Sequence, residues 1–92
     1  MSNVKLSGHH LLTAQRILAH PAGHNIEWRD AAAMLAELDA IAEEANGRFI
    51  VTLGGESEVF DRSRGKDLDV QQVVDLRRML IAAGVTPDTL RS

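Results

Sequence analysis

The fold is decided by residues 48–60, which read RFIVTLGGESEVF. The first six of these residues are rich in β-branched and aromatic side chains, a composition that favours a β-strand. Gly54 and Gly55 follow at once and predict a two-residue hairpin turn, after which residues 56–60 return as the partner strand. The stretch therefore predicts an antiparallel hairpin.

The length of the turn also predicts the register of this hairpin. The predicted pairs are Phe49 with Phe60, Ile50 with Val59, Val51 with Glu58 and Leu53 with Glu56. The first two pairs join apolar side chains, which stabilise neighbouring strands. Because the last two pairs join an apolar side chain to a carboxylate, we expect that half of the hairpin to lie near the solvent-exposed end of the sheet.

Helical patterns precede the hairpin. Residues 9–19 carry apolar residues at helical spacing and are followed by Pro21, which stops a helix. Residues 26–39 are strong helix formers with an apolar stripe, and Asn25 is placed to cap their first turn. Residues 41–45 fit a strand as well as they fit a helix end.

A third helix is predicted after the hairpin. Residues 61–66 read as a loop, and Asp69 followed by Gln72 forms a capping box. The apolar residues of segment 70–81 then have helical spacing, and Gly84 supplies the left-handed residue that ends a helix. We therefore expect a helix over residues 70–81.

The chain has 92 residues, a length that fits one domain. We expect residues 1–8 to be flexible, residues 9–85 to form the domain, and residues 86–92 to be a tail or one extra turn. The order of elements predicts an α+β fold, in which an N-terminal helix precedes an α-β-β-β-α core. Short hairpin links place the helices on one face of a small antiparallel sheet.

Composition excludes several classes of protein. Cys is absent, which rules out disulfide frameworks, zinc ribbons and thiol nucleophiles. The net charge of −3 argues against bulk electrostatic binding to nucleic acid or to an anionic membrane. No apolar run approaches the roughly 20 residues that span a bilayer, and the N-terminus does not resemble a signal peptide. We therefore expect a cytoplasmic protein, and no residue pattern predicts a cofactor.

A family resemblance rests on three short segments and on the order of the elements around them. The segments are residues 46–51 (NGRFIV), 65–68 (GKDL) and 83–84 (AG). Through them, residues 26–84 resemble the HicA family, small toxins of bacterial toxin–antitoxin pairs. The resemblance implies a fold like that of a double-stranded-RNA-binding domain, cleavage of messenger RNA, and a HicB-like antitoxin as partner.

The catalytic motif of that family is not matched. HicA toxins share a Gly-Ser-His motif at the opening of the second strand, and its His is the general acid or base. Gly47 matches the Gly of the motif, but Arg48 and Phe49 follow it. The four histidines are His9, His10, His20 and His24, and all precede the HicA-like segment. The catalytic residue is therefore left unassigned.

Four cations are predicted to contact RNA: Arg48, Arg62, Arg64 and Lys66. The last three occupy five residues just ahead of the final helix. In a double-stranded-RNA-binding fold, that loop is well placed to touch phosphates. Aspartates interleave with these cations, so a solvated face of mixed charge is the alternative interpretation.

A second set of residues is predicted to contact protein: Leu11, Leu12, Ile17 and Trp28. The first three give the N-terminal helix an apolar face, which it would offer to a partner protein or to a second copy in a homodimer. Trp28 is expected to pack where the first two helices meet.

Metal ligation is not predicted. His20 and His24 have the spacing of two ligands on one helical face, but the proline and glycine between them break a helix. The acidic pairs Glu43-Glu44 and Glu56/Glu58 read as a solvated face of the sheet, with hard-oxygen ligands for a divalent cation as the alternative.

Three hypotheses about function remain. The first is a HicA-like RNA-binding module without ribonuclease activity, which the element order and the Gly65-Lys66 loop favour. The second is an active toxin that cleaves messenger RNA with a residue outside the family motif. The third is a protein-interaction module that binds no nucleic acid.

Overall fold

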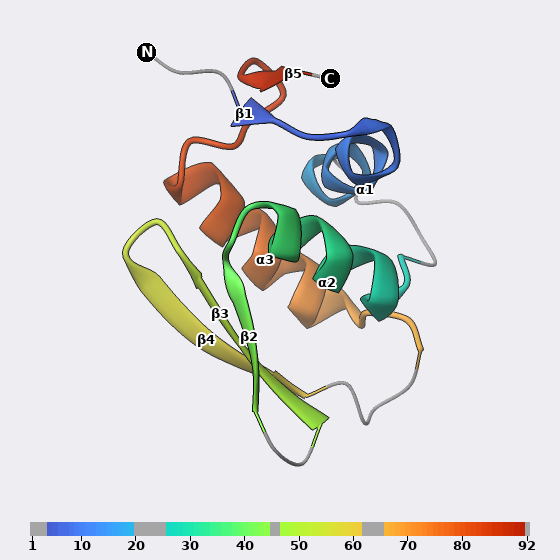
Figure 1. Ribbon diagram of the computed structural model, residues 1–92, viewed down its shortest axis with the longest axis vertical. Coiled ribbons are helices and arrows are strands. Elements are labelled where there is room, and N and C mark those ends of the chain that lie inside the picture. The colour runs from blue at the N-terminus through green and yellow to red at the C-terminus, as the bar shows by residue number, and fades with distance from the viewer. Residues whose placement is uncertain (1–3, 20–25, 45–46, 62–65, 92) are drawn as a thin grey trace.

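The structure is a computed structural model that describes residues 4–19, 26–44, 47–61 and 66–91 (Figure 1). Its elements in chain order are β1 (Val4–Lys5), α1 (Gly8–Leu18), α2 (Trp28–Glu37), β2 (Ile41–Glu44), β3 (Arg48–Leu53), β4 (Glu56–Asp61), α3 (Val70–Ala82) and β5 (Leu90–Arg91). The predicted α+β class is confirmed, because a helix, three antiparallel strands and a helix follow one another in this order.

The main sheet has three strands in the order β2-β3-β4. Each predicted cross-strand pair of the hairpin is confirmed, from Phe49 with Phe60 to Leu53 with Glu56. Gly54 and Gly55 have φ values of 59° and 81°, the left-handed conformation that a tight two-residue turn demands. Residues 41–44 of the ambiguous segment 41–45 form a strand, because β2 pairs along its whole length with β3. Ala45 lies outside the described residues.

The sheet has one covered face and one open face. Phe49, Val51 and Phe60 point into the core, where each is at least nine-tenths buried. The half of the hairpin nearest the turn was expected to lie near the solvent-exposed end of the sheet. Thr52 and Ser57 are exposed there, but Val51 departs from this expectation, because it has no exposed surface. The reason is that α3 packs against β3 and covers this half of the hairpin.

Three helices form the other layers of the molecule. α2 packs against β2 and α3 packs against β3, while α1 packs on α2 and α3. Figure 1 shows α1 at the side of the helix pair that is farther from the sheet. Each helix buries residues spaced three or four apart, such as Ala14 and Ile17 in α1 and Ala31 and Met34 in α2. These stripes meet in one core.

Different interactions determine where α2 and α3 begin. α3 begins with the predicted capping box: the Gln72 N–H donates to Asp69 Oδ1 at 2.8 Å, and the Asp69 N–H donates to Gln72 Oε1 at 3.0 Å. α2 begins at Trp28, later than predicted, because the Ile26 carbonyl accepts a hydrogen bond from the Leu68 N–H instead of starting the helix. Asn25, the predicted cap, lies outside the described residues.

Both ends of the described chain take part in the fold. Residues 1–8 were expected to be flexible and residues 86–92 to be a tail or one extra turn. Residues 86–90 form such a turn, since the Leu90 N–H donates to the Thr86 carbonyl at 3.1 Å, and β1 and β5 pair in parallel. Leu6 is 1% exposed and Leu90 is 7% exposed, so the two ends bury apolar side chains in the core. The Thr89 hydroxyl donates to the Gly84 carbonyl at 2.6 Å and turns the chain back after α3. Two-residue strands have no periodicity that a sequence pattern could reveal.

None of the helices within the described ranges is long and apolar enough to cross a membrane.

Candidate nucleic-acid interface

The segments that lead into α2 and α3 are paired with each other. The Trp28 N–H donates to the Lys66 carbonyl at 2.8 Å, and the Leu68 N–H donates to the Ile26 carbonyl at 2.9 Å. A β-bridge joins Glu27 to Asp67 between these two bonds. The N-terminal ends of two helices that are far apart in sequence are therefore held side by side.

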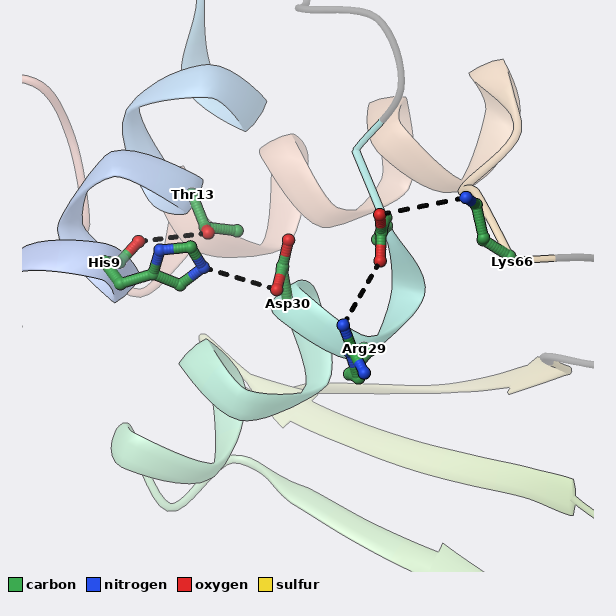
Figure 2. Close-up of polar contacts among 6 residues, drawn as sticks. His9, Thr13, Arg29, Asp30 and Lys66 are labelled. Carbon is green, nitrogen blue, oxygen red and sulfur yellow. Dashed lines mark hydrogen bonds and ion pairs between the residues drawn. The ribbon is translucent and has the colours of Figure 1, made fainter.

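Two exposed cations meet around one carboxylate at this junction. Arg29 Nη2 lies 3.9 Å from Glu27 Oε1, and Lys66 Nζ lies 4.0 Å from Glu27 Oε2 (Figure 2). The side chains of Arg29 and Lys66 are 86% and 76% exposed. Exposed ion pairs at this separation contribute little to stability. Both cations can therefore turn toward an anionic ligand at small cost.

The remaining predicted RNA contacts are separated from this junction or lie outside the described residues. Arg48 is exposed on the open face of the sheet, and its cross-strand neighbours are Glu44 and Asp61. Arg62 and Arg64 are outside the described part of the chain. Of the predicted loop cluster, the structure therefore places only Lys66.

The two arginines of α3 join this helix to other elements of the fold. Arg77 donates from Nε to the Ile17 carbonyl and from Nη2 to the Ala19 carbonyl, both at 3.2 Å, and so caps the end of α1. Arg78 contacts Glu56 and donates from Nη2 to Glu58 Oε2 at 2.9 Å. The hydrogen bond to Glu56 raises the pKa of Arg78. The acidic pair on β4 is thus bound by a guanidinium rather than being only a solvated face.

Two histidines of α1 face carboxylates of α2. His9 Nε2 lies 3.3 Å from Asp30 Oδ1 (Figure 2), and His10 Nδ1 lies 2.6 Å from Glu37 Oε1. The Ser7 hydroxyl also donates to Glu37 Oε2 at 2.8 Å. The hydrogen bonds from His10 and then from Ser7 lower the pKa of Glu37. His20 and His24 lie outside the described residues.

The predicted protein-contact residues do not form one surface. Ile17 and Trp28 are 0% and 3% exposed, so in this structure both side chains belong to the core. Trp28 packs against the sheet. Its ring centroid lies 5.2 Å from that of Phe49 and 5.8 Å from that of Phe60. Leu12 is 51% exposed, and Leu11 is partly buried against the core.

Arg29 is the residue that sequence reasoning missed. It stands alone in a helix that begins with acidic neighbours, so no cluster of cations marks it. Only the pairing of residues 26–28 with residues 66–68 brings it near Lys66. Among the described residues, no group of three or more His, Asp or Glu side chains is arranged to hold a metal ion.

Comparison with protein-family models, with curated proteins and with solved structures finds no match for this chain.

Proposed function

We propose that the protein is an RNA-binding module of the HicA-like toxin–antitoxin type, and that it lacks ribonuclease activity. The observation that supports this proposal is the junction of the two helix starts, where Arg29 and Lys66 stand exposed around Glu27. The helix-strand-strand-strand-helix order is the one that the resemblance to HicA implies, and it sets the start of the last helix beside the start of α2.

Phosphate oxygens are the ligand that suits this junction. Arg29 and Lys66 supply two cations. Arg29 lies in the first turn of α2, where the helix dipole favours negative charge, and Lys66 lies four residues before α3 begins. RNA could replace Glu27 as their partner because the present pairs are long and exposed. Binding through so few cations would be weak and sensitive to salt.

The proposed lack of ribonuclease activity is supported by the residue that stands where the family motif has its catalytic His. Phe49 occupies this position, and its side chain is 8% exposed within the core. It has no group that titrates and no access to a substrate. The two described histidines, His9 and His10, lie on α1 and each contacts a carboxylate of α2.

The proposal is tested by fluorescence anisotropy of a labelled double-stranded RNA at about 50 mM salt. The Lys66→Gln variant should weaken binding several-fold, since one phosphate contact is lost. Gln15→Glu is the matched control, because it changes the net charge by the same amount at an exposed position of α1, a helix that contributes no residue to the junction. For two phosphate contacts, raising the salt to about 200 mM should weaken binding about tenfold.

Two outcomes would contradict the proposal. One is the absence of saturable binding at low salt, and the other is equal weakening by both variants, which would indicate a diffuse charge effect. Incubation with a messenger RNA tests the chemistry separately, and the RNA should stay intact. Cleavage that His9→Ala or His10→Ala abolishes would favour the active-toxin hypothesis.

A further inference from the structure

β4 is an open edge of the main sheet. Within the described residues it pairs only with β3, and Figure 1 shows no element beyond it on that side. The Thr52 N–H donates to the Ala40 carbonyl, toward β2, so Thr52 and its partner Ser57 form a pair that is not hydrogen-bonded within the hairpin. With the period of two along a strand, the main-chain groups of Ser57 and Val59 point toward the open edge.

The inner side of this edge is acidic. Glu56 and Glu58 lie on the helix-facing side of β4, in the same row as buried Phe60. Arg78 contacts both carboxylates, and Asp75 acts on the same guanidinium through space. Three carboxylates thus surround one guanidinium, which leaves an excess of negative charge beside the edge. Inward-facing charges of this kind reject an apolar strand.

The outer side of the same strand is apolar. Val59 is 58% exposed on the open face of the sheet and stands beside Ile50. The opposite edge differs, because β2 has four residues and exposes Glu43 and Glu44. Shortness and exposed charge are common protections of an edge strand. β4 has six residues in an unbroken ladder, so it is the edge that can accept another strand.

The geometry points to β4 as a docking edge for an extended segment of a partner protein, whose inward side chains are Lys or Arg and whose outward side chains are apolar. Basic side chains would complement Glu56, Glu58 and Asp75, while apolar ones would cover Val59. A second copy of the chain is a poorer occupant, because pairing β4 with itself would bring two acidic clusters together. This inference goes beyond RNA binding and uses a different part of the molecule.

Synthetic peptides test the chemistry of the occupant. The probe is a fluorescein-labelled peptide in which Lys and Val alternate, and the control peptide has Glu in place of Lys. The Lys–Val peptide should bind saturably and the Glu–Val peptide should not. Binding should also slow the exchange of the amide protons of Ser57 and Val59, since an added strand accepts hydrogen bonds from them. If the Lys–Val peptide only adhered to acidic side chains elsewhere on the protein, the exchange of these two amide protons would not change.

Two variants locate the site. Val59→Lys should weaken the Lys–Val peptide about fivefold or more, because it puts a charged side chain on the outer face, where the valines of the peptide would otherwise cover an apolar one. Ala42→Lys is the matched control: Ala42 is exposed in the same cross-strand row, on the other edge of the sheet. Val59→Pro removes an edge donor without touching the hydrogen bonds to β3, and it should weaken binding by a similar factor. Circular dichroism checks that each variant is folded.

Equal binding of the two peptides, equal effects of Val59→Lys and Ala42→Lys, or unchanged exchange at Ser57 and Val59 would each overturn the inference. A concentration-dependent dimer that Val59→Lys dissociates would also overturn it, in favour of a second copy. Lys66→Gln should leave peptide binding unchanged. The RNA proposal and this one can therefore fail independently.

Discussion

Single residues join the layers of this protein at a few polar contacts, of which Glu37 is the clearest. Its carboxylate lies at the end of α2 and accepts hydrogen bonds from the Ser7 N–H at 3.2 Å and the Ser7 hydroxyl at 2.8 Å. His10 of α1 lies 2.6 Å from the same carboxylate. These contacts favour the charged form of Glu37 and lower its pKa.

The lowered pKa of Glu37 predicts a pH-dependent contribution to stability. A carboxyl whose pKa is lower in the folded state stabilises the fold above its unfolded value, here 4.5, and loses that effect as the pH falls through the folded value. Glu37→Gln should therefore be less stable than the wild type at pH 7, and the difference should shrink in acid. Urea unfolding across pH measures this.

The matched control for that comparison is Glu44→Gln, which removes a carboxyl from an exposed position of β2. It should cost less stability at pH 7 than Glu37→Gln. A difference between Glu37→Gln and the wild type that persists at low pH would contradict the electrostatic explanation and indicate a loss of packing.

At the scale of elements, the hairpin turn is fitted against the end of α3. A Cβ added to Gly54 would lie 2.8 Å from the carbonyl carbon of Ala82, closer than side chains approach backbone. A Cβ added to Gly55 would have no atom within 4 Å. Both glycines have positive φ, so they share the conformational requirement and differ only in the contact with α3.

This difference predicts unequal effects of two alanine substitutions. Gly55→Ala should cost about 1 kcal/mol, the penalty of a left-handed conformation for a residue with a side chain. Gly54→Ala should cost about 2–4 kcal/mol, since the clash with α3 adds to that penalty. Thermal or denaturant unfolding of both variants measures the difference. Equal costs would mean that α3 can move away from the turn.

At the scale of the whole molecule, the two ends of the chain close the core together. β1 and β5 pair in parallel, and Leu6 and Leu90 beside them are buried. Figure 1 shows β1 and β5 side by side at one end of the molecule. The described residues at the two chain ends, which lie outside the predicted helices and hairpin, are therefore part of the folded domain.

The closure predicts that Leu6 contributes to global stability. Leu6→Ala should cost about 2–4 kcal/mol, because it leaves a cavity under the paired ends. Leu12→Ala is the matched control on α1, where the side chain is 51% exposed, and it should cost less than about 1 kcal/mol. A Leu6→Ala protein as stable as the wild type would show that the ends unfold separately from the core.

Of the two cations in the candidate site, one could be predicted from the sequence and the other could not. Lys66 could be predicted from a local pattern, because it lies in a loop just ahead of a helix whose start is identified by a capping box. Arg29 joins it only through main-chain hydrogen bonds between residues 26–28 and 66–68. Arg77 and Arg78 are equally basic in sequence but are engaged by α1 and β4. A cation count therefore cannot separate the cations that maintain the fold from those that remain available to a ligand.

Local residue patterns were sufficient for the hairpin register, the capping box of α3 and the strand β3. Each of these depends on residues a few positions apart, whose turn geometry and side-chain periodicity are specified before the chain folds. The start of α2, the place of Trp28, the pairing of the chain ends and the partners of the arginines required the assembled molecule. They depend on contacts between distant segments, such as the hydrogen bond from Arg77 to the Ile17 carbonyl across 60 residues. Such contacts arise only when apolar faces of separate elements pack together and bring their polar groups within reach.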